Sequence, residues 1–276
     1  MRTAEVVRNL GRMTSMPSLV LALAVALTAC ASTASQPSTT SSTLRVVSYN
    51  IKHGRGNDDR VDLERTARVL RAQQPDIVAL QEVDERVQRS GFVTQADSLG
   101  RLLGMHAAFG SFFDYQGGQY GMAILSRHPI ASVNPIRLPD GNEPRIALMV
   151  KIAMPAGDTI AVVDVHFDWV TNDSFRFAQA SKLAAVLDTT RLPYILLGDF
   201  NDEPGSRTLG LFTSRATEAR KPRNAHFTFP SSPAPVQEID FIFASPAAAW
   251  TAREVRVIDE RLASDHRPVL AVFSRR

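Results

Sequence analysis

The polar residues at the ends of several apolar segments are of the types that could hydrolyse a phosphate ester with the help of a divalent metal. Carboxylate and amide oxygens suit magnesium, whereas zinc usually takes His and Cys ligands, and no thiol is available at these segment ends. Each residue alone has an ordinary explanation as a turn, a solvated surface group or a hydrogen-bonded histidine. Together they supply what metal-assisted hydrolysis at phosphorus requires, and the set is Asn50, Glu82, His166, Asp199, Asn201, Asp240, Asp265 and His266.

The segment Tyr194–Asp202 contains the clearest of these strand ends. Its apolar run stops at Gly198, and Asp199 and Asn201 follow almost at once. A short apolar run bounded by turn residues is typical of a buried strand that carries its last side chains to the rim of a sheet, where catalytic carboxylates are common. The alternative is that Gly, Asp and Asn only form a turn, because all three tolerate left-handed backbone. Similar polar residues at other strand ends favour the catalytic interpretation.

Apolar segments and helical patterns predict the elements that must bring these residues together. Apolar residues at helical spacing predict helices around residues 63–70, 94–103, 180–187 and 206–212. Strands interspersed with helices, without strict alternation, favour an α+β fold in which two mixed β-sheets pack face to face and helices cover the outside. The predicted strands are residues 44–49, 77–80, 122–126, 147–152, 159–167, 194–199, 239–244 and 269–273.

Residues 109–121 are rich in glycine and aromatic residues and predict a loop between two elements. The rings belong to Phe112, Phe113, Tyr115 and Tyr120. They could form a lip that faces the substrate, or they could close the edge of the core, because aromatic side chains serve both purposes. The sequence leaves both interpretations open.

The first 29 residues predict an export signal. Arg2, Arg8 and Arg12 precede a nine-residue apolar run, Leu19–Leu27, which is too short to span a bilayer. These 29 residues hold three Arg and one Glu, so without them the formal net charge falls from +3 to +1. The basic isoelectric point of the whole chain is therefore a weak argument for nucleic-acid binding, which usually requires a clustered basic surface.

Cys30, the only cysteine, follows this signal, so the chain has no disulfide framework. Residues 27–30, Leu-Thr-Ala-Cys, resemble the lipobox of bacterial lipoproteins, in which cleavage before the cysteine leaves it to be acylated. The alternative is cleavage at a nearby small-residue site, which would release a soluble secreted protein. Residues 30–43 predict a flexible tether and residues 44–276 one folded domain. We therefore predict a monomer anchored to a membrane through lipidated Cys30, facing the periplasm or the cell exterior.

Seven short motifs, spread over the predicted domain from end to end, resemble the ordered motifs of the endonuclease/exonuclease/phosphatase superfamily. The resemblance implies a four-layer α/β/β/α sandwich, a divalent metal site and hydrolysis at phosphorus. The histidine of the fourth motif is similar to the deoxyribonuclease I, sphingomyelinase and inositol-polyphosphate phosphatase branches, whereas apurinic endonucleases typically differ there. The motifs are Ser48–Ile51, Gln81–Asp84, Tyr120–Ser126, Val165–Phe167, Gly198–Asn201, Ile239–Ile242 and Ser264–Pro268.

The resemblance also implies which residues hold the metal and the attacking water. Asn50 and Glu82 would bind the metal, and Asp265 would join them. The expected ion is Mg²⁺, with Mn²⁺ or Ca²⁺ as alternatives. Asp199 would orient or deprotonate the water, and Asn201 would donate to a phosphate oxygen.

Two histidines and an arginine are the residues that the resemblance implies for the phosphoryl group. His266, oriented by Asp240, and His166 would face this group from two sides and stabilise the charge that develops on its oxygens. Arg145 lies where some relatives have an arginine near the active face, but an exposed ion pair would explain it equally well.

The sequence leaves the substrate class open. The leading interpretation is hydrolysis of phosphodiester, or phosphomonoester, bonds outside the cytoplasm. A secreted nuclease should carry a basic groove for backbone phosphates, which a nearly neutral chain does not favour. A sphingomyelinase-like enzyme should expose apolar loops, for which Phe112, Phe113 and Trp169 are candidates, while a sugar or inositol phosphatase needs neither feature. A binding protein that keeps the fold without the chemistry is the alternative from another class.

Overall fold

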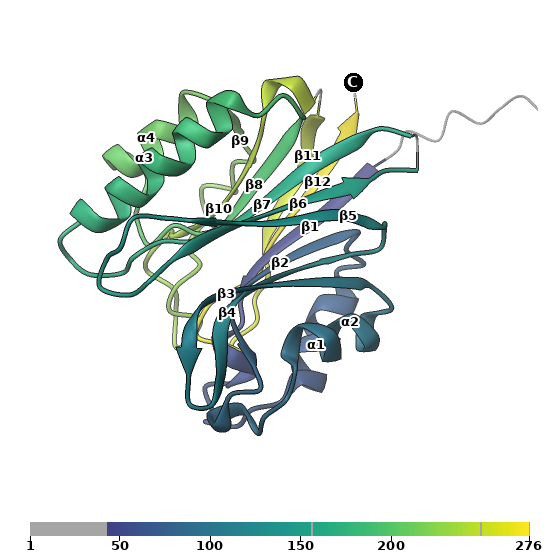
Figure 1. The fold of residues 1–276 in the computed structure, drawn as a ribbon, viewed down its shortest axis with the longest axis vertical. Helices are drawn as coiled ribbons and strands as arrows, with labels where there is room; N and C mark the ends of the chain where they lie inside the picture. The colour runs from purple at the N-terminus through teal and green to yellow at the C-terminus, as the bar shows by residue number, and fades with distance from the viewer. Residues whose placement is uncertain (1–42, 156, 249, 276) are drawn as a thin grey trace, which may run out of the picture. The chain divides into compact units, whose positions relative to one another are not determined.

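The computed structural model describes residues 43–155, 157–248 and 250–275, which form two β-sheets with helices on their outer faces (Figure 1). Six strands make up each sheet, and in both sheets antiparallel strands flank one parallel pair. Four α-helices lie within the described residues. The predicted α+β sandwich of two mixed sheets flanked by helices is therefore confirmed.

The two sheets have no strand in common. In spatial order, the first contains β11 (Trp250–Val257), β12 (Val269–Arg275), β1 (Thr43–Asn50), β2 (Ile77–Glu85), β4 (Gly118–Ser126) and β3 (His106–Tyr115). The second contains β5 (Ile130–Arg137), β6 (Ile146–Ala153), β7 (Thr159–His166), β8 (Tyr194–Asp199), β10 (Asp240–Ala244) and β9 (Thr217–Glu218).

The two parallel pairs bring polar strand ends to one end of the sandwich. A helical crossover joins the strands of each pair, α1 (Leu63–Ala72) between β1 and β2 and α3 (Ser174–Thr189) between β7 and β8, because parallel neighbours cannot be joined by a tight turn. Asn50 ends β1 and Asp199 ends β8, and their side chains are hydrogen-bonded to each other. The carboxyl ends of strands from both sheets therefore meet.

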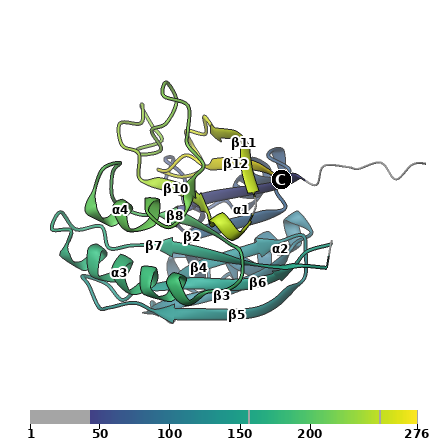
Figure 2. The same ribbon diagram turned by 90° about the horizontal axis from the view of Figure 1, so that it is seen from above.

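Three apolar clusters hold the layers together. One fills the space between the sheets. A second fixes α1 and α2 (Gln95–Leu103) to the first sheet, and a third fixes α3 and α4 (Arg207–Thr213) to the second. In Figure 1 the two helix pairs accordingly lie on opposite sides of the strands, and in Figure 2, seen from above, α3 and α4 lie in front of the strands and α1 and α2 behind them.

The helices begin and end at residues suited to those positions. The Asp62 carboxylate accepts a hydrogen bond from the Arg65 N–H at the start of α1, and the Ser206 hydroxyl accepts one from the Leu209 N–H at the start of α4. Gly104 follows α2 in the left-handed conformation that glycine adopts without strain. These local signals explain why three of the four predicted helices agree closely with the observed ones, whereas α3, which has no side-chain cap, begins six residues before the predicted residues 180–187.

Phenylalanines that directly follow three polar strand ends pack together beneath α3 and α4. The pairs are His166–Phe167, Asp199–Phe200 and Asp240–Phe241. The ring of Phe200 lies 5.5 Å from that of Phe167 and 5.6 Å from that of Phe241. Because successive side chains alternate between the faces of a strand, the polar member of each pair faces the space between the sheets.

The loop predicted for residues 109–121 is wrong, because this segment forms most of the hairpin of β3 and β4. Gly110 is a packing position, since a Cβ there would lie only 2.7 Å from the Ile146 side chain. The turn lies at Gln116 and Gly117, both with positive φ. Phe112 and Tyr120 are buried in the core between the sheets, so these two rings close the edge of the core rather than form an exposed lip.

The predicted signal of residues 1–29, Cys30 and nearly all of the tether lie outside the described residues. Thr43, the last residue of the predicted tether, is the first residue of β1. Among the described residues, no helix has the length and apolar character needed to cross a membrane.

Candidate active site

A cavity of about 490 Å³ lies where the polar strand ends of the two sheets meet. Three of the predicted residues, Asn50, Asp199 and Asp240, are buried beside it, in contact with residues of its wall. The structure therefore brings all nine predicted site residues of the folded domain together. Those that line the cavity are Glu82, Arg145, His166, Asn201, Asp265 and His266.

The Asp199 carboxylate is the centre of this cluster. Its Oδ2 accepts a hydrogen bond from Asn50 Nδ2 at 3.1 Å and lies 3.6 Å from the Nε2 atoms of both His166 and His266. Its Oδ1 accepts a hydrogen bond from the Asn201 N–H at 2.9 Å. One carboxylate thus contacts residues from three other segments of the chain, in addition to the neighbouring Asn201.

Burial and charge leave Asp199 able to exchange a proton near neutral pH. Burial is the largest cause and, with the negative charge of Asp240, raises the pKa of Asp199 to about 7, although the charge of His266 and two hydrogen bonds oppose the shift. A general base is most effective when its pKa lies near the working pH. The environment of Asp199 therefore suits a base that takes a proton from water.

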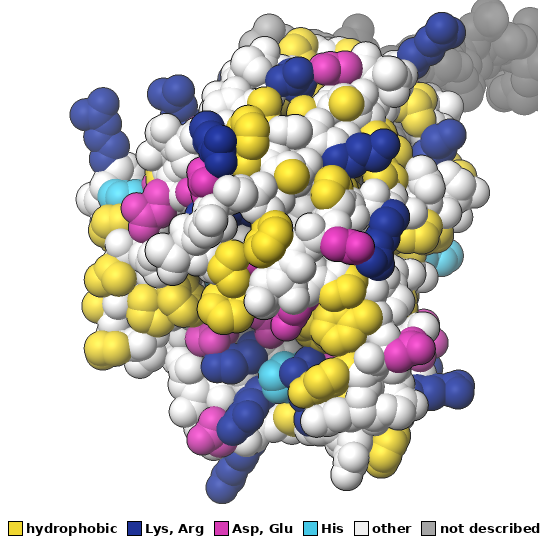
Figure 3. All heavy atoms as spheres, turned by 60° about the vertical axis from the view of Figure 1, so that its left-hand side comes forward, with side chains coloured by type: hydrophobic (Ala, Val, Ile, Leu, Met, Phe, Trp, Pro, Cys, Tyr) yellow, Lys and Arg dark blue, Asp and Glu magenta, His cyan; other side chains and the backbone are white. Residues whose placement is uncertain are grey.

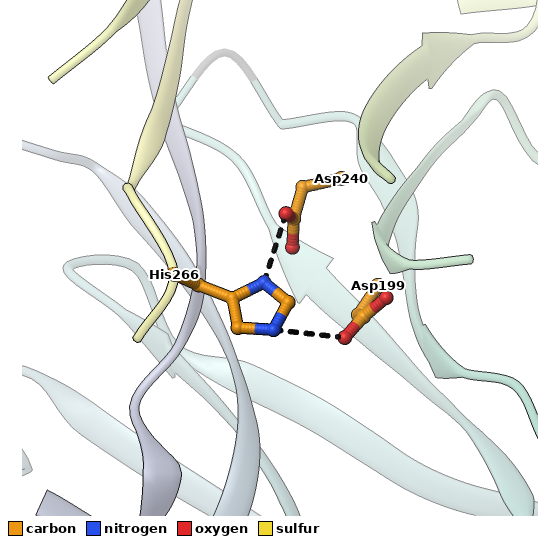
Figure 4. Close-up of side chains that lie close together, drawn as sticks. All are labelled: Asp199, Asp240 and His266. Carbon is orange, nitrogen blue, oxygen red and sulfur yellow. Dashed lines mark hydrogen bonds and ion pairs between the residues drawn. The ribbon is translucent and has the colours of Figure 1, made fainter. Parts of the chain in front are cut away.

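Asp240 and His266 form a second charged pair beside Asp199. Asp240 lies directly opposite Asp199 in the register of β10 and β8, and its Oδ2 is 3.0 Å from His266 Nδ1. Figure 4 shows the His266 ring between the two carboxylates. Burial alone favours the neutral ring, but the carboxylates of Asp240 and Asp199 outweigh it and raise the pKa of His266 to about 10. His266 is therefore an imidazolium at neutral pH.

His166 has the opposite protonation state. Burial, followed by the charges of Arg145 and His266, lowers its pKa well below the usual value, so the ring is neutral. Arg145 Nη1 lies 3.4 Å from His166 Nδ1, and since a guanidinium can only donate, Nδ1 accepts and Nε2 carries the proton. The Nε2–H of His166 therefore faces Asp199.

Arg145 is buried, so the interpretation of this residue as an exposed ion-pair partner is wrong. Only 1% of it is exposed, and the guanidinium lies 4.9 Å from the centre of the Phe112 ring. Arg145 Nη2 donates to Glu143 Oε2 at 2.9 Å. The side chain thus places a permanent positive charge in the wall of the cavity.

Glu82 reaches the cavity because β2 is irregular there. The pairing with β4 shifts register between Gln81 and Val83, and Glu82 has a φ of 57°. A β-bulge of this kind re-aims a side chain. Glu82 Oε1 accepts a hydrogen bond from Asn50 Nδ2 at 3.0 Å, and burial, with the nearby charge of Asp265, raises the pKa of Glu82.

Lys52 is a residue of the site that the sequence did not point to. Its ammonium lies 2.7 Å from Asp265 Oδ2, and its backbone N–H donates to Asn50 Oδ1 at 3.1 Å. It lies between the predicted strand of residues 44–49 and the predicted helix of residues 63–70, and only the fold brings its amine to Asp265. A lysine thus balances the negative charge on this side of the cavity.

Two groups of side chains in the site have the chemistry to hold a divalent cation. Ligand atoms of Asp199, Asp240 and His266 lie within 4.8 Å of one another, although His266 would have to lose a proton to bind. Glu82 and Asp265 offer partly exposed carboxylates, and a cation bound between them would lower the raised pKa of Glu82. The predicted set of Asn50, Glu82 and Asp265 thus fits a hard cation and stays a prediction.

Asn201 and Asp164 make hydrogen bonds that hold the segments around the cluster together. Asn201 Nδ2 donates to the Phe167 carbonyl at 3.0 Å, which uses one of its two amide hydrogens. Asp164 is fully buried between the sheets, and Gln81 Nε2 donates to its Oδ1 at 2.6 Å. Burial raises the pKa of Asp164 well above its usual range, and its hydrogen bond with Gln81 connects the two sheets.

The sandwich and its buried cluster of acids and histidines are those of a phosphoesterase. Residues 47–266 match the model of the Endonuclease/Exonuclease/phosphatase family, and the chain belongs to this family.

Proteins of known sequence or structure resemble nearly the whole folded part. The uncharacterized protein YbhP of Escherichia coli (strain K12) is 28% identical over 245 residues, which cover 82% of this chain and 94% of YbhP. An endonuclease/exonuclease/phosphatase family protein from Bacteroides thetaiotaomicron superposes with a TM-score of 0.72 at 21% identity, over 85% of this chain and 98% of that chain. The mannosyl-6-phosphatase Bt3783 of Bacteroides thetaiotaomicron VPI-5482 superposes with a TM-score of 0.68 at 21% identity, over 83% and 99% of the two chains.

Proposed function

We propose that this protein is a divalent-metal-dependent hydrolase of phosphodiester or phosphomonoester bonds that acts outside the cytoplasm. The observation that carries the proposal is the Asp199 carboxylate, whose pKa lies near 7 and whose Oδ2 faces both a cationic and a neutral histidine. A structural ion pair would need neither the neutral histidine nor a carboxylate that titrates near neutral pH.

Asp199 accepts the proton of the attacking water in this proposal. The hydrogen bonds from Asn50 and the Asn201 backbone hold the carboxylate in place, so its proton affinity and direction are set before the substrate binds. Because burial and the charge of Asp240 both disfavour the ionised form, taking up a proton relieves an existing cost.

The two histidines and Arg145 stabilise the charge on the phosphoryl oxygens. His266 donates as a cation held by Asp240, His166 donates as a neutral ring, and Arg145 adds a permanent charge behind His166. Fixed donors in a site shielded from water stabilise developing charge more strongly than water does. A divalent cation, when bound by Asn50, Glu82 and Asp265, would supply a Lewis acid for an oxygen of the reacting phosphate.

Small phosphate esters suit this site better than nucleic acid. Figure 3 shows one face of the molecule on which Lys and Arg side chains are scattered among acidic and apolar ones, rather than gathered in a stripe. The fold similarity to a mannosyl-6-phosphatase agrees with a small substrate.

The extracytoplasmic location rests on the N-terminal sequence. The proposal is that Cys30 is acylated and that the following residues tether the enzyme to a membrane. Expression of the full chain with Cys30→Ser, followed by cell fractionation, tests this. The variant should move from the membrane to the soluble fraction, and a wild-type protein that is already soluble would contradict the anchor.

Hydrolysis of bis(p-nitrophenyl) phosphate and p-nitrophenyl phosphate tests the enzymatic proposal. We expect Mg²⁺-dependent turnover that EDTA abolishes, and a fall in kcat of about 10³-fold for Asp199→Asn, since the amide keeps the shape but cannot take the proton. Asp188→Asn is the matched control, because that exposed carboxylate pairs with Arg215 away from the cavity. If Asp199→Asn kept wild-type kcat on both esters, the proposal would be wrong.

A further inference from the structure

Trp169 is a large, exposed aromatic side chain on the wall of the active-site cavity. It is 59% exposed, whereas Phe167, two residues earlier, is fully buried. It lines the same cavity as His166 and His266, which face the phosphoryl group in the proposed function. An indole kept in contact with solvent at such a place is available to a ligand.

Buried polar groups fix the backbone on both sides of this indole. Asp168 is fully buried, its Oδ2 accepts from the Asn142 N–H at 2.6 Å, and its Oδ1 accepts from the Val170 N–H at 3.1 Å. The Asp168 N–H in turn donates to Gln179 Oε1, on α3, at 2.9 Å.

Arg176 of α3 holds the same segment from beneath. Its Nη1 donates to the carbonyl of Asp168 at 3.2 Å and to that of Val170 at 2.7 Å, so it binds the residue before Trp169 and the residue after it. Its Nε is paired with Asp202 Oδ2 at 3.1 Å. A buried carboxylate and a buried guanidinium thus hold an exposed ring, which a ligand can contact without first ordering the loop.

Two polar side chains on the same cavity wall are free to meet a ligand. The Gln237 side-chain amide makes no hydrogen bond with another described residue. Glu143 uses Oε2 for Arg145, and its side chain is 36% exposed. An amide and a carboxylate are the donor and acceptor groups that suit hydroxyls, and an aromatic face packs against the apolar face of a ring.

We propose that Trp169, Gln237 and Glu143 form a subsite for the alcohol portion of the substrate, and that this portion is a ring with several hydroxyl groups, as in a monosaccharide phosphate. The inference rests on the proposed function, which places the phosphoryl group at the histidines. A cavity of about 490 Å³ is in the range of small-molecule sites.

Kinetics of Trp169→Ala on esters with and without a ring test the subsite. With mannose 6-phosphate we expect kcat/KM to fall about 10-fold, mainly through KM, and with glycerol 3-phosphate to stay within about twofold, because only the ring packs on the indole. Trp169→Phe should lose only about threefold on the sugar phosphate. The melting temperature of Trp169→Ala should stay within about 2 °C of wild type, because the ring is exposed and Asp168 and Arg176 hold the loop.

Fluorescence separates the subsite from the catalytic proposal. In a Trp250→Phe background, which leaves Trp169 as the only tryptophan, mannose 6-phosphate should change the emission saturably, and inorganic phosphate should not. Binding without hydrolysis of any ester by the wild type would keep the subsite and refute the enzyme. An equal kcat/KM loss of Trp169→Ala on both esters would overturn the subsite. The subsite would also be overturned if Trp169→Ala kept wild-type kinetics on the sugar phosphate but lost binding to phosphatidylcholine vesicles. That result would assign Trp169 to a membrane-binding surface.

Discussion

Each sheet brings one parallel pair of strands to the cavity, and the side chains at the ends of the two pairs differ in type and in burial. The β1–β2 edge carries Asn50 and Glu82, with a carboxylate that is partly exposed. The β7–β8 edge carries His166 and Asp199, both buried. The local backbone accounts for the difference. A bulge turns Glu82 toward the cavity, whereas Gly198 lets β8 run close to β7, since a Cβ there would lie 2.0 Å from the Val165 carbonyl oxygen.

Access to water is what separates the roles of the two edges. On the buried edge, burial and the charge of Asp240 raise the pKa of Asp199 to about 7, and His266, from the segment that precedes β12 of the first sheet, lies beside it. On the more open edge, the partly exposed carboxylates of Glu82 and Asp265 can exchange water for a cation. Proton transfer therefore suits the second sheet, and cation binding suits the first.

The sharpest test of this division compares Glu82→Gln with Asp199→Asn in Mg²⁺ binding. Glu82→Gln should weaken Mg²⁺ binding at least about 100-fold and abolish the rise in melting temperature that Mg²⁺ causes, because it removes a charged ligand. Asp199→Asn should bind Mg²⁺ within about fivefold of wild type although it is inactive. Isothermal titration calorimetry and thermal denaturation measure both. The reverse result would place the cation on Asp199, Asp240 and His266.

The pH dependence of Asp240→Asn tests the buried edge. Wild-type activity should rise with a pKa near 7, as Asp199 loses its proton, and fall near 10, as His266 loses its own. The Asp240 charge raises both values, so in the variant both limbs should move to lower pH, and kcat should fall about 100-fold. A profile with unmoved limbs would show that Asp240 does not set the charge of His266.

The stability of the folded protein should also depend on pH through the protonation of His266. The pKa of His266 is raised from 6.5 in the unfolded chain to about 10, so its contribution is fully present below pH 6.5 and is lost as the pH rises through 10. The melting temperature of metal-free wild type, relative to Asp240→Asn, should therefore be most favourable near pH 6 and decline toward pH 10.

The smallest expected effect is that of Lys52→Met on the open edge. The ammonium pairs with Asp265 and competes with a cation for that carboxylate, so its removal should tighten Mg²⁺ binding about fivefold. Calorimetry at low and high salt measures the change. Weaker Mg²⁺ binding in Lys52→Met would contradict a competing role, and Lys182→Met, on α3, is the control.

Strand ends and motif spacing predicted most of the site because these signals are local. Asp199 and Asn201 stand after an apolar run, and an N-terminal cap or a C-terminal glycine marks most helices. Residues 109–121 were wrongly predicted to form a loop because they contain Gly110 and Gly121. These glycines allow close packing, and a packing glycine cannot be distinguished from a loop glycine without the neighbouring strand. The exposed strand β5 was missed because its apolar pattern is weak and contains Pro135.

The charges and protonation states of the site could not be predicted from the sequence, because they depend on residues that are distant in the chain. Lys52, the buried state of Arg145 and the opposite protonation of His166 and His266 all depend on partners more than 20 residues away in the chain. Residue type alone assigns the same ordinary pKa to both histidines. Only the fold places one beside a guanidinium and the other between two carboxylates.

The packed phenylalanine rings under α3 and α4 fix the positions of the polar residues next to them in the chain. The pairs are His166–Phe167, Asp199–Phe200 and Asp240–Phe241. Each reacting group is a single peptide unit from a ring locked against its neighbours, so a shift of these rings tilts the groups on the other face of the sheet. Drift in the helices should therefore be felt first as slower turnover and only later as unfolding.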